Sequence, residues 1–142
     1  MILLSVAMAG LLAAVEVPAI VVQAADSPVK IGRATVLTVP GDPPVLLYSA
    51  TNLTDDVFEV FTVMVFIFDA KGTLKTQHTA PGRRTLEARE TKYSTIVLDS
   101  GPVDTGGPIV IGVNQVQRVN SDTWWRTDLT AAAEAAVPRV KP

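Results

Sequence analysis

The sequence predicts an all-β fold, an antiparallel β-sandwich of about seven strands, with a leader before it and a short helix or tail after it. Three observations support this prediction. Apolar and polar residues alternate along several segments, and β-branched residues are frequent in those segments. Clusters of Pro, Gly, Asn and Asp separate the segments at fairly regular spacing. The sequence contains no repeat, coiled coil or second domain.

The first 24 residues have the character of a secretory signal peptide. Residues 1–15 carry no charge, and the apolar run ends in small residues. We therefore expect cleavage after Ala24 and export of a β-sandwich domain over residues 25–128 to the periplasm or the exterior.

Two features of this leader are unusual. No basic residue precedes the apolar run, and Glu16 lies inside it. A start codon upstream of Met1 would explain the missing charge. Another explanation is an uncleaved anchor, because residues 1–22 are long enough to cross a bilayer. A carboxylate within such a span costs roughly 2.5 kcal/mol or more, so cleavage is the favoured interpretation.

The strands follow the alternation of the sequence. The segments with strand character are 29–39, 45–51, 58–68, 73–79, 93–98, 109–119 and 123–127. Turn residues separate them, for example Gly72, which can adopt a positive φ. Such a pattern is typical of an immunoglobulin-like sandwich, with a closed barrel as the second choice. Asp128 is placed to cap an Ala-rich helix over residues 129–136, and residues 129–142 form a short helix or flexible tail.

One part of the chain resembles a known family. Thr51-Asn52-Leu53-Thr54, the strand ending in Val65-Phe66-Ile67-Phe68-Asp69, and Gly72-Thr73-Leu74 are similar to the FxLYD-type domain. That resemblance covers residues 29–98 well and implies a small immunoglobulin-like module of exported bacterial proteins, many of unknown role. Val65, Ile67 and Phe68 depart conservatively from the family pattern, and Asp69 matches it. The shared motifs belong to the fold and carry no catalytic residues, so the resemblance implies a binding or structural role.

Composition excludes several kinds of site. The chain has no Cys and one His, which excludes disulfides, Cys-ligated metals, Cys nucleophiles and multi-His metal sites. A net charge of −2 without a basic run argues against non-specific nucleic-acid binding. We therefore predict no cofactor and no metal.

Enzymatic or metal-dependent chemistry has few candidate residues. His78 is the only imidazole and lies in a polar strand, without a nucleophile motif, so a solvated strand position is the favoured interpretation. Asp55 and Asp56, together with Asp69, offer oxygen ligands for Ca²⁺, but turn capping explains these residues better. Asn52-Leu53-Thr54 has the form of a glycosylation sequon and is interpreted as an Asx turn.

The strand at residues 58–68 is apolar on both faces. A sandwich strand ordinarily buries one face and exposes the other, so the second face needs a loop, the segment 129–137 or another chain to cover it. Trp124 and Trp125 are adjacent, so on a strand they point to opposite faces. The favoured interpretation is that the outer Trp packs under the C-terminal segment, and the alternative is that it lies exposed beside Arg126 and binds a protein or glycan partner. The candidate interaction surface comprises Phe61, Val63, Val65, Trp124, Trp125 and Arg126.

The sequence thus predicts an exported, non-catalytic binding or structural module of the bacterial cell envelope. Its partner is expected to be an unknown protein or a second copy of the chain, and no nucleic acid. A membrane-tethered accessory domain is the first alternative, if residues 1–22 stay attached. An enzyme that uses His78 and aspartates is the less favoured alternative.

Overall fold

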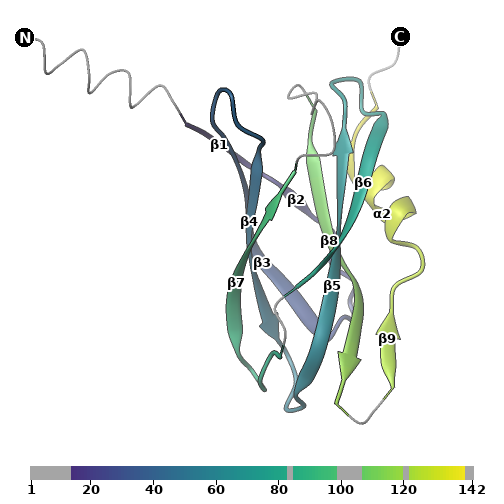
Figure 1. Cartoon of the computed structure of the whole chain (residues 1–142). Coiled ribbons are helices and arrows are strands. Elements are labelled where there is room, and N and C mark those ends of the chain that lie inside the picture. Colours follow the sequence, from purple (N-terminus) through teal and green to yellow (C-terminus); the bar gives the residue numbers. More distant parts are fainter. Residues whose placement is uncertain (1–13, 83–84, 99–106, 120–121, 140–142) are drawn as a thin grey trace, which may run out of the picture.

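The computed structural model describes residues 14–82, 85–98, 107–119 and 122–139. Two β-sheets face each other in a sandwich, and one helix lies against the outside of the second sheet (Figure 1). Sheet A has the order β1-β3-β4-β7, and every neighbouring pair in it is antiparallel. Its strands are β1 (Val15–Pro18), β3 (Val29–Thr38), β4 (Val45–Asn52) and β7 (Thr91–Val97).

Sheet B has the order β2-β8-β5-β6. Its strands are β2 (Ile20–Val21), β5 (Phe58–Phe68), β6 (Leu74–Pro81), β8 (Ile109–Arg118) and β9 (Thr123–Trp125). β9 also pairs with β8, and β2 pairs with β8 in parallel, the one parallel pair among the described strands. Helix α2 (Leu129–Ala136) follows β9.

The predicted all-β sandwich is confirmed, and so are most of its elements. β5 and α2 have the predicted bounds, and the other predicted strands are found with ends shifted by a few residues. Gly72 turns the chain between β5 and β6 with a φ of 82°. Asp128 precedes α2 as predicted, but its carboxylate does not cap the helix. The Arg126 Nε donates to that carboxylate instead, at 3.0 Å.

The main core lies between the two sheets. Tyr48 and Leu46 of sheet A are enclosed there, as are Phe61 and Val63 of sheet B. A β-bulge near Val60, where the pairing with β8 shifts by one residue, interrupts the strict alternation along β5. Phe58 therefore belongs to the same core as Phe61, whereas an uninterrupted strand would place the two side chains on opposite faces.

A second core lies outside sheet B, beneath helix α2. Its buried residues are Phe66, Phe68, Val110, Leu129, Ala133 and Val137. Gly112 of β8 allows the close approach, because a Cβ there would lie 2.6 Å from Cδ1 of Leu129. The second apolar face of β5 is thus covered by the C-terminal segment, which was one of the three coverings that the sequence suggested.

Residues 15–22 belong to the sandwich, which differs from the expected domain start at residue 25. Residues 15–18 pair with β3, and residues 20–21 pair with β8. Between them, Ala19 N–H donates to the Ala34 carbonyl at 2.9 Å, and Val22 N–H donates to the Ile111 carbonyl at 3.0 Å. Ala19 and Val21 pack on the core between the sheets, and Ile20 and Val22 pack on the second core. In the sequence, an apolar run of this kind resembles the hydrophobic part of a signal peptide. Among the described residues, no helix is long and apolar enough to span a membrane.

Candidate functional site

The outer face of sheet A carries a shallow hollow of about 670 Å³. Its lining residues are Glu16, Arg33, Thr35, Leu47, Tyr48, Tyr93, Ser94 and Thr95. They come from all four strands of the sheet, β1, β3, β4 and β7. We call the residues Glu16, Arg33, Thr35, Leu47, Tyr93 and Thr95 the sheet A face.

Strand register places these side chains together. Leu47 lies opposite Thr35 on one side and Thr95 on the other, and Thr35 lies opposite Pro18 of β1. Side chains directly across an antiparallel pair are about 5 Å apart and point to the same face. The sheet A face therefore combines a leucine and an aromatic ring with hydroxyl groups and charges of both signs.

A β-bulge in β3 brings Arg33 to this face. The pairing of β3 with β4 shifts between Ile31 and Ala34, and the Arg33 N–H donates to the Ser49 hydroxyl at 3.0 Å. A Cβ at Gly32 would lie 2.5 Å from that same hydroxyl oxygen, so a larger residue at this position would displace the Ser49 hydroxyl. Ser49 is thereby buried on a face whose other residues are largely accessible.

The sheet A face exposes two large side chains. Tyr93 is 70% exposed and Leu47 is 39% exposed, and Val97 extends the apolar area along β7. A tyrosine with an exposed ring, surrounded by polar and charged groups, is the composition that recurs at energetically important positions of protein interfaces.

The two tryptophans point to opposite sides of β9, in agreement with the alternation expected for a strand. Trp124 packs against the inter-sheet core, and its indole N–H donates to the Asp26 carboxylate at 3.1 Å. Trp125 is 58% exposed. Arg126 does not stand free beside it, because its guanidinium is engaged by Asp128 and by the carbonyl of Val22, and its side chain is 14% exposed.

The predicted surface on β5 requires a correction. Phe61, Val63 and Val65 are fully buried in the core between the sheets, so they offer no surface in the folded chain. The opposite face of β5 carries Phe66 and Phe68, which lie under α2. Of the predicted surface residues, only Trp125 is largely exposed.

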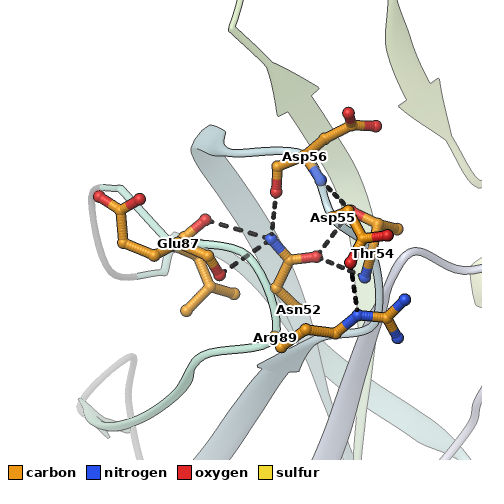
Figure 2. A network of polar contacts seen from close by, with 7 residues as sticks. Asn52, Thr54, Asp55, Asp56, Glu87 and Arg89 are labelled. Carbon is orange, nitrogen blue, oxygen red and sulfur yellow. Dashed lines mark hydrogen bonds and ion pairs between the residues drawn. The ribbon is translucent and has the colours of Figure 1, made fainter.

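Asn52 organises the end of the sandwich between β4 and β5 (Figure 2). Its Nδ2 lies 2.7 Å from the Asp56 carbonyl, 3.0 Å from that of Glu87 and 3.2 Å from that of Leu86. Its Oδ1 accepts from the N–H and hydroxyl of Thr54, at 2.8 and 2.9 Å. This is the Asx turn interpreted from the sequence, in a side chain with no exposed surface.

The aspartates do not form a metal site. Asp55 and Asp56 lie in the turn before β5, whereas Asp69 follows the end of that 11-residue strand. Asp55 pairs with Arg89 at 3.1 Å. Within the described part of the chain, no group of three His, Asp or Glu side chains is placed to hold a metal ion.

Asp69 instead holds the turn between β5 and β6. One carboxylate oxygen accepts from the N–H groups of Lys71 and Thr73, both at 2.9 Å, and the other lies 3.5 Å from the Lys75 ammonium. The bond from the Thr73 N–H, followed by that from Lys71 and the charge of Lys75, lowers the pKa of this carboxyl below 3.8, against an opposing effect of desolvation.

His78 lies on β6, opposite Val65, and is half-buried. The sequence interpretation of a solvated strand position is therefore only partly met. The residue opposite it on β5, Val65, has no group that could act with the imidazole as a nucleophile or an acid.

Comparison with known proteins informs the fold. No family model matches the chain, and no curated protein matches it. A solved structure of a hypothetical protein from Peptoclostridium difficile 630 is similar, with a TM-score of 0.59 and 10% sequence identity, over 82% of this chain and 95% of that one. At that identity the likeness extends to the fold alone.

Proposed function

We propose that this chain is an exported, non-catalytic protein-binding module of the bacterial cell envelope, which binds its partner through the sheet A face. The FxLYD-type resemblance is in keeping with this role. The observation that carries the proposal is the hollow of the sheet A face, with the exposed ring of Tyr93 beside Leu47 and flanked by Arg33 and Glu16.

The chemistry of this face suits a polypeptide partner. An apolar side chain of the partner would cover Tyr93 and Leu47. Thr35 and Thr95 would donate or accept hydrogen bonds around that contact. Arg33 and Glu16 lie within the same hollow, so a partner with charges of both signs would find a counter-charge for each.

A binding measurement with matched variants tests the proposal. A photo-crosslinking amino acid at position 47, introduced in the producing cell, should capture a partner that the same group at Trp125 does not capture. With the partner identified, Arg33→Ala and Leu47→Ser should each weaken binding about tenfold, equivalent to about 1.4 kcal/mol. A Trp125→Ala control should leave it unchanged. Equal affinity of the wild type and all three variants for the partner would contradict the proposal.

Tethering of the same module to the membrane is a second candidate, which one observation favours. Cleavage after Ala24 would remove β1 and β2, including Glu16 of the sheet A face. The strand pairing therefore favours retention of the residues from 15 onward, either after an upstream cleavage or on an uncleaved anchor. The intact mass and N-terminal sequence of the protein from the producing cell distinguish these possibilities. A mature chain that begins at Ala25 would exclude the tether.

A further inference from the structure

The outer edge of β7 is free of any partner strand among the described residues, and of the features that ordinarily protect an edge it carries only one charged side chain, that of Lys92. β6, the edge of the other sheet, contains Lys75 and ends at Pro81. β1 is four residues long and contains Glu16 and Pro18. β7 has seven residues without a proline or an acidic residue.

The one charge on β7 is already engaged. The Lys92 ammonium donates to the Thr85 carbonyl at 2.7 Å and lies 3.6 Å from a carboxylate oxygen of Glu90. A strand that approached this edge would therefore meet no free charge on β7.

The direction of the backbone groups along β7 follows from two hydrogen bonds at its ends. Asn52 N–H donates to the Glu90 carbonyl, and Leu98 N–H donates to the Pro44 carbonyl. In an antiparallel pair, hydrogen-bonded positions alternate, so the even-numbered residues between them face β4. The N–H and C=O groups of Thr91, Tyr93, Thr95 and Val97 then point away from β4, toward solvent.

We infer that this edge pairs with the same edge of a second copy, antiparallel and centred on Ser94. This register places Tyr93 opposite Thr95 of the other copy and Thr91 opposite Val97. All four outward-facing residues of each copy then bond, for about eight N–H···O=C bonds in total. Both pairings are of kinds that stabilise a sheet, aromatic with β-branched and β-branched with β-branched.

The residue at the two-fold axis is small. Ser94 would lie opposite Ser94 of the other copy, and its small side chain, whose hydroxyl is buried within its own chain, leaves room for the two strands to approach. The two copies would form one continuous sheet, with the two sheet A faces side by side. Pairing at this edge does not require that the sheet A face binds a partner, so the two proposals can fail separately.

Two proline variants test the inference on the full chain. Thr95→Pro removes an outward N–H of β7 without touching the bonds to β4. Thr79→Pro is the matched control on β6, because the bond from Gly82 N–H to the Phe61 carbonyl shows that Thr79 also faces outward. Light scattering on a concentration series should give a dimer mass for the wild type and Thr79→Pro, and loss of the dimer for Thr95→Pro. A wild type that stays monomeric throughout would overturn the inference, as would the same response to both prolines.

A single cysteine tests the register directly, and decides the matter if Thr95→Pro does not fold. The chain has no Cys. In the proposed pairing the two Cα atoms of residue 94 lie about 4.5 Å apart, within the range that a disulfide can span. Ser94→Cys should therefore form a disulfide-linked dimer under mild oxidation, whereas Gln77→Cys on β6 should not. A Ser94→Cys chain that stays unlinked, or that links to a different protein in the producing cell, would overturn the inference.

Discussion

The Arg126 guanidinium donates a hydrogen bond to the carbonyl of Val22, 104 positions earlier in the chain, at 3.4 Å. The same guanidinium binds Asp128, just before α2. Nearby, the Trp124 indole donates to Asp26. The two ends of the described chain therefore hold each other through polar contacts, in addition to the pairing of β2 with β8.

Removal of the N-terminal strands is expected to destabilise the domain. A variant without residues 1–24 loses the β1 and β2 pairing, the Ile20 and Val22 side chains of the second core, and the acceptor of Arg126. Its free energy of unfolding should fall by about 3 kcal/mol or more relative to a variant without residues 1–14. Denaturant unfolding of the two truncated proteins measures the difference. Equal midpoints and slopes would show that residues 15–24 contribute nothing to stability.

Replacement of Asn52 should be among the most costly polar substitutions in the chain. Asn52→Ala removes the side-chain donor of the Asp56 carbonyl and the second donor of the Leu86 carbonyl, and it removes the acceptor of the Thr54 N–H, so we expect a loss of about 2–4 kcal/mol. The matched change Thr54→Ala removes only a hydroxyl at the rim of the same turn, and should cost about 1 kcal/mol. Urea unfolding of both variants tests the ranking, and a smaller effect at position 52 than at position 54 would contradict it.

The ionised carboxylate of Asp69 should contribute to the free energy of unfolding at neutral pH, and this contribution should be lost in acid. Because the pKa of this carboxyl is lower in the folded chain than in the unfolded chain, its contribution is fully present above the unfolded value of about 4 and is lost as the pH falls through the folded value. Asp69→Asn should therefore be less stable than the wild type at pH 7, with a gap that narrows below about pH 4. Denaturant unfolding at a series of pH values measures this gap.

Asp55→Asn is the control for that series. The Asp55 carboxylate is highly exposed and its ion pair with Arg89 lies at the surface, so its removal should change stability little at any pH. If the curves of Asp69→Asn and the wild type run parallel down to low pH, the turn does not depend on the ionised carboxylate.

Helix α2 should stabilise sheet B chiefly through Leu129. Leu129→Ala leaves a cavity against Phe66 and Phe68 in the second core, so we expect a loss of about 2–5 kcal/mol and stronger binding of a hydrophobic dye. Trp125→Ala, at an exposed position, should stay within about 0.5 kcal/mol of the wild type. Comparable losses for the two variants would mean that α2 does not seal this face.

Elements with a strong local signal could be predicted from the sequence. The bounds of β5 follow from its long β-branched and aromatic run, and those of α2 from five alanines after Asp128. The Asx turn at Asn52 followed from local chemistry, since its acceptor contacts lie within two residues. The three carbonyls that its Nδ2 meets could not be predicted, because two of them belong to a distant segment.

Features that depend on distant partners were missed. A bulge beside Val60 brings Phe58 to the same face as Phe61, although strict alternation would place them on opposite faces, and no periodicity reveals one inserted residue. The apolar residues around Ile20 gave the same signal as a leader, because strand pairing with β8 involves residues 90 positions later. The sheet A face could not be predicted because Leu47 and Tyr93 have no distinctive sequence context. Only the register between β4 and β7 places their side chains on the same face.

The pairing of β2 with β8 also sets the order in which this domain can be completed. As the polypeptide is synthesised from its N-terminus, Ile20 emerges long before Val110, the residue it pairs with. Closing so large a loop is entropically costly and slows folding. β2 therefore remains without its partner strand until β8 has been made, and sheet B is completed only when most of the chain has been synthesised.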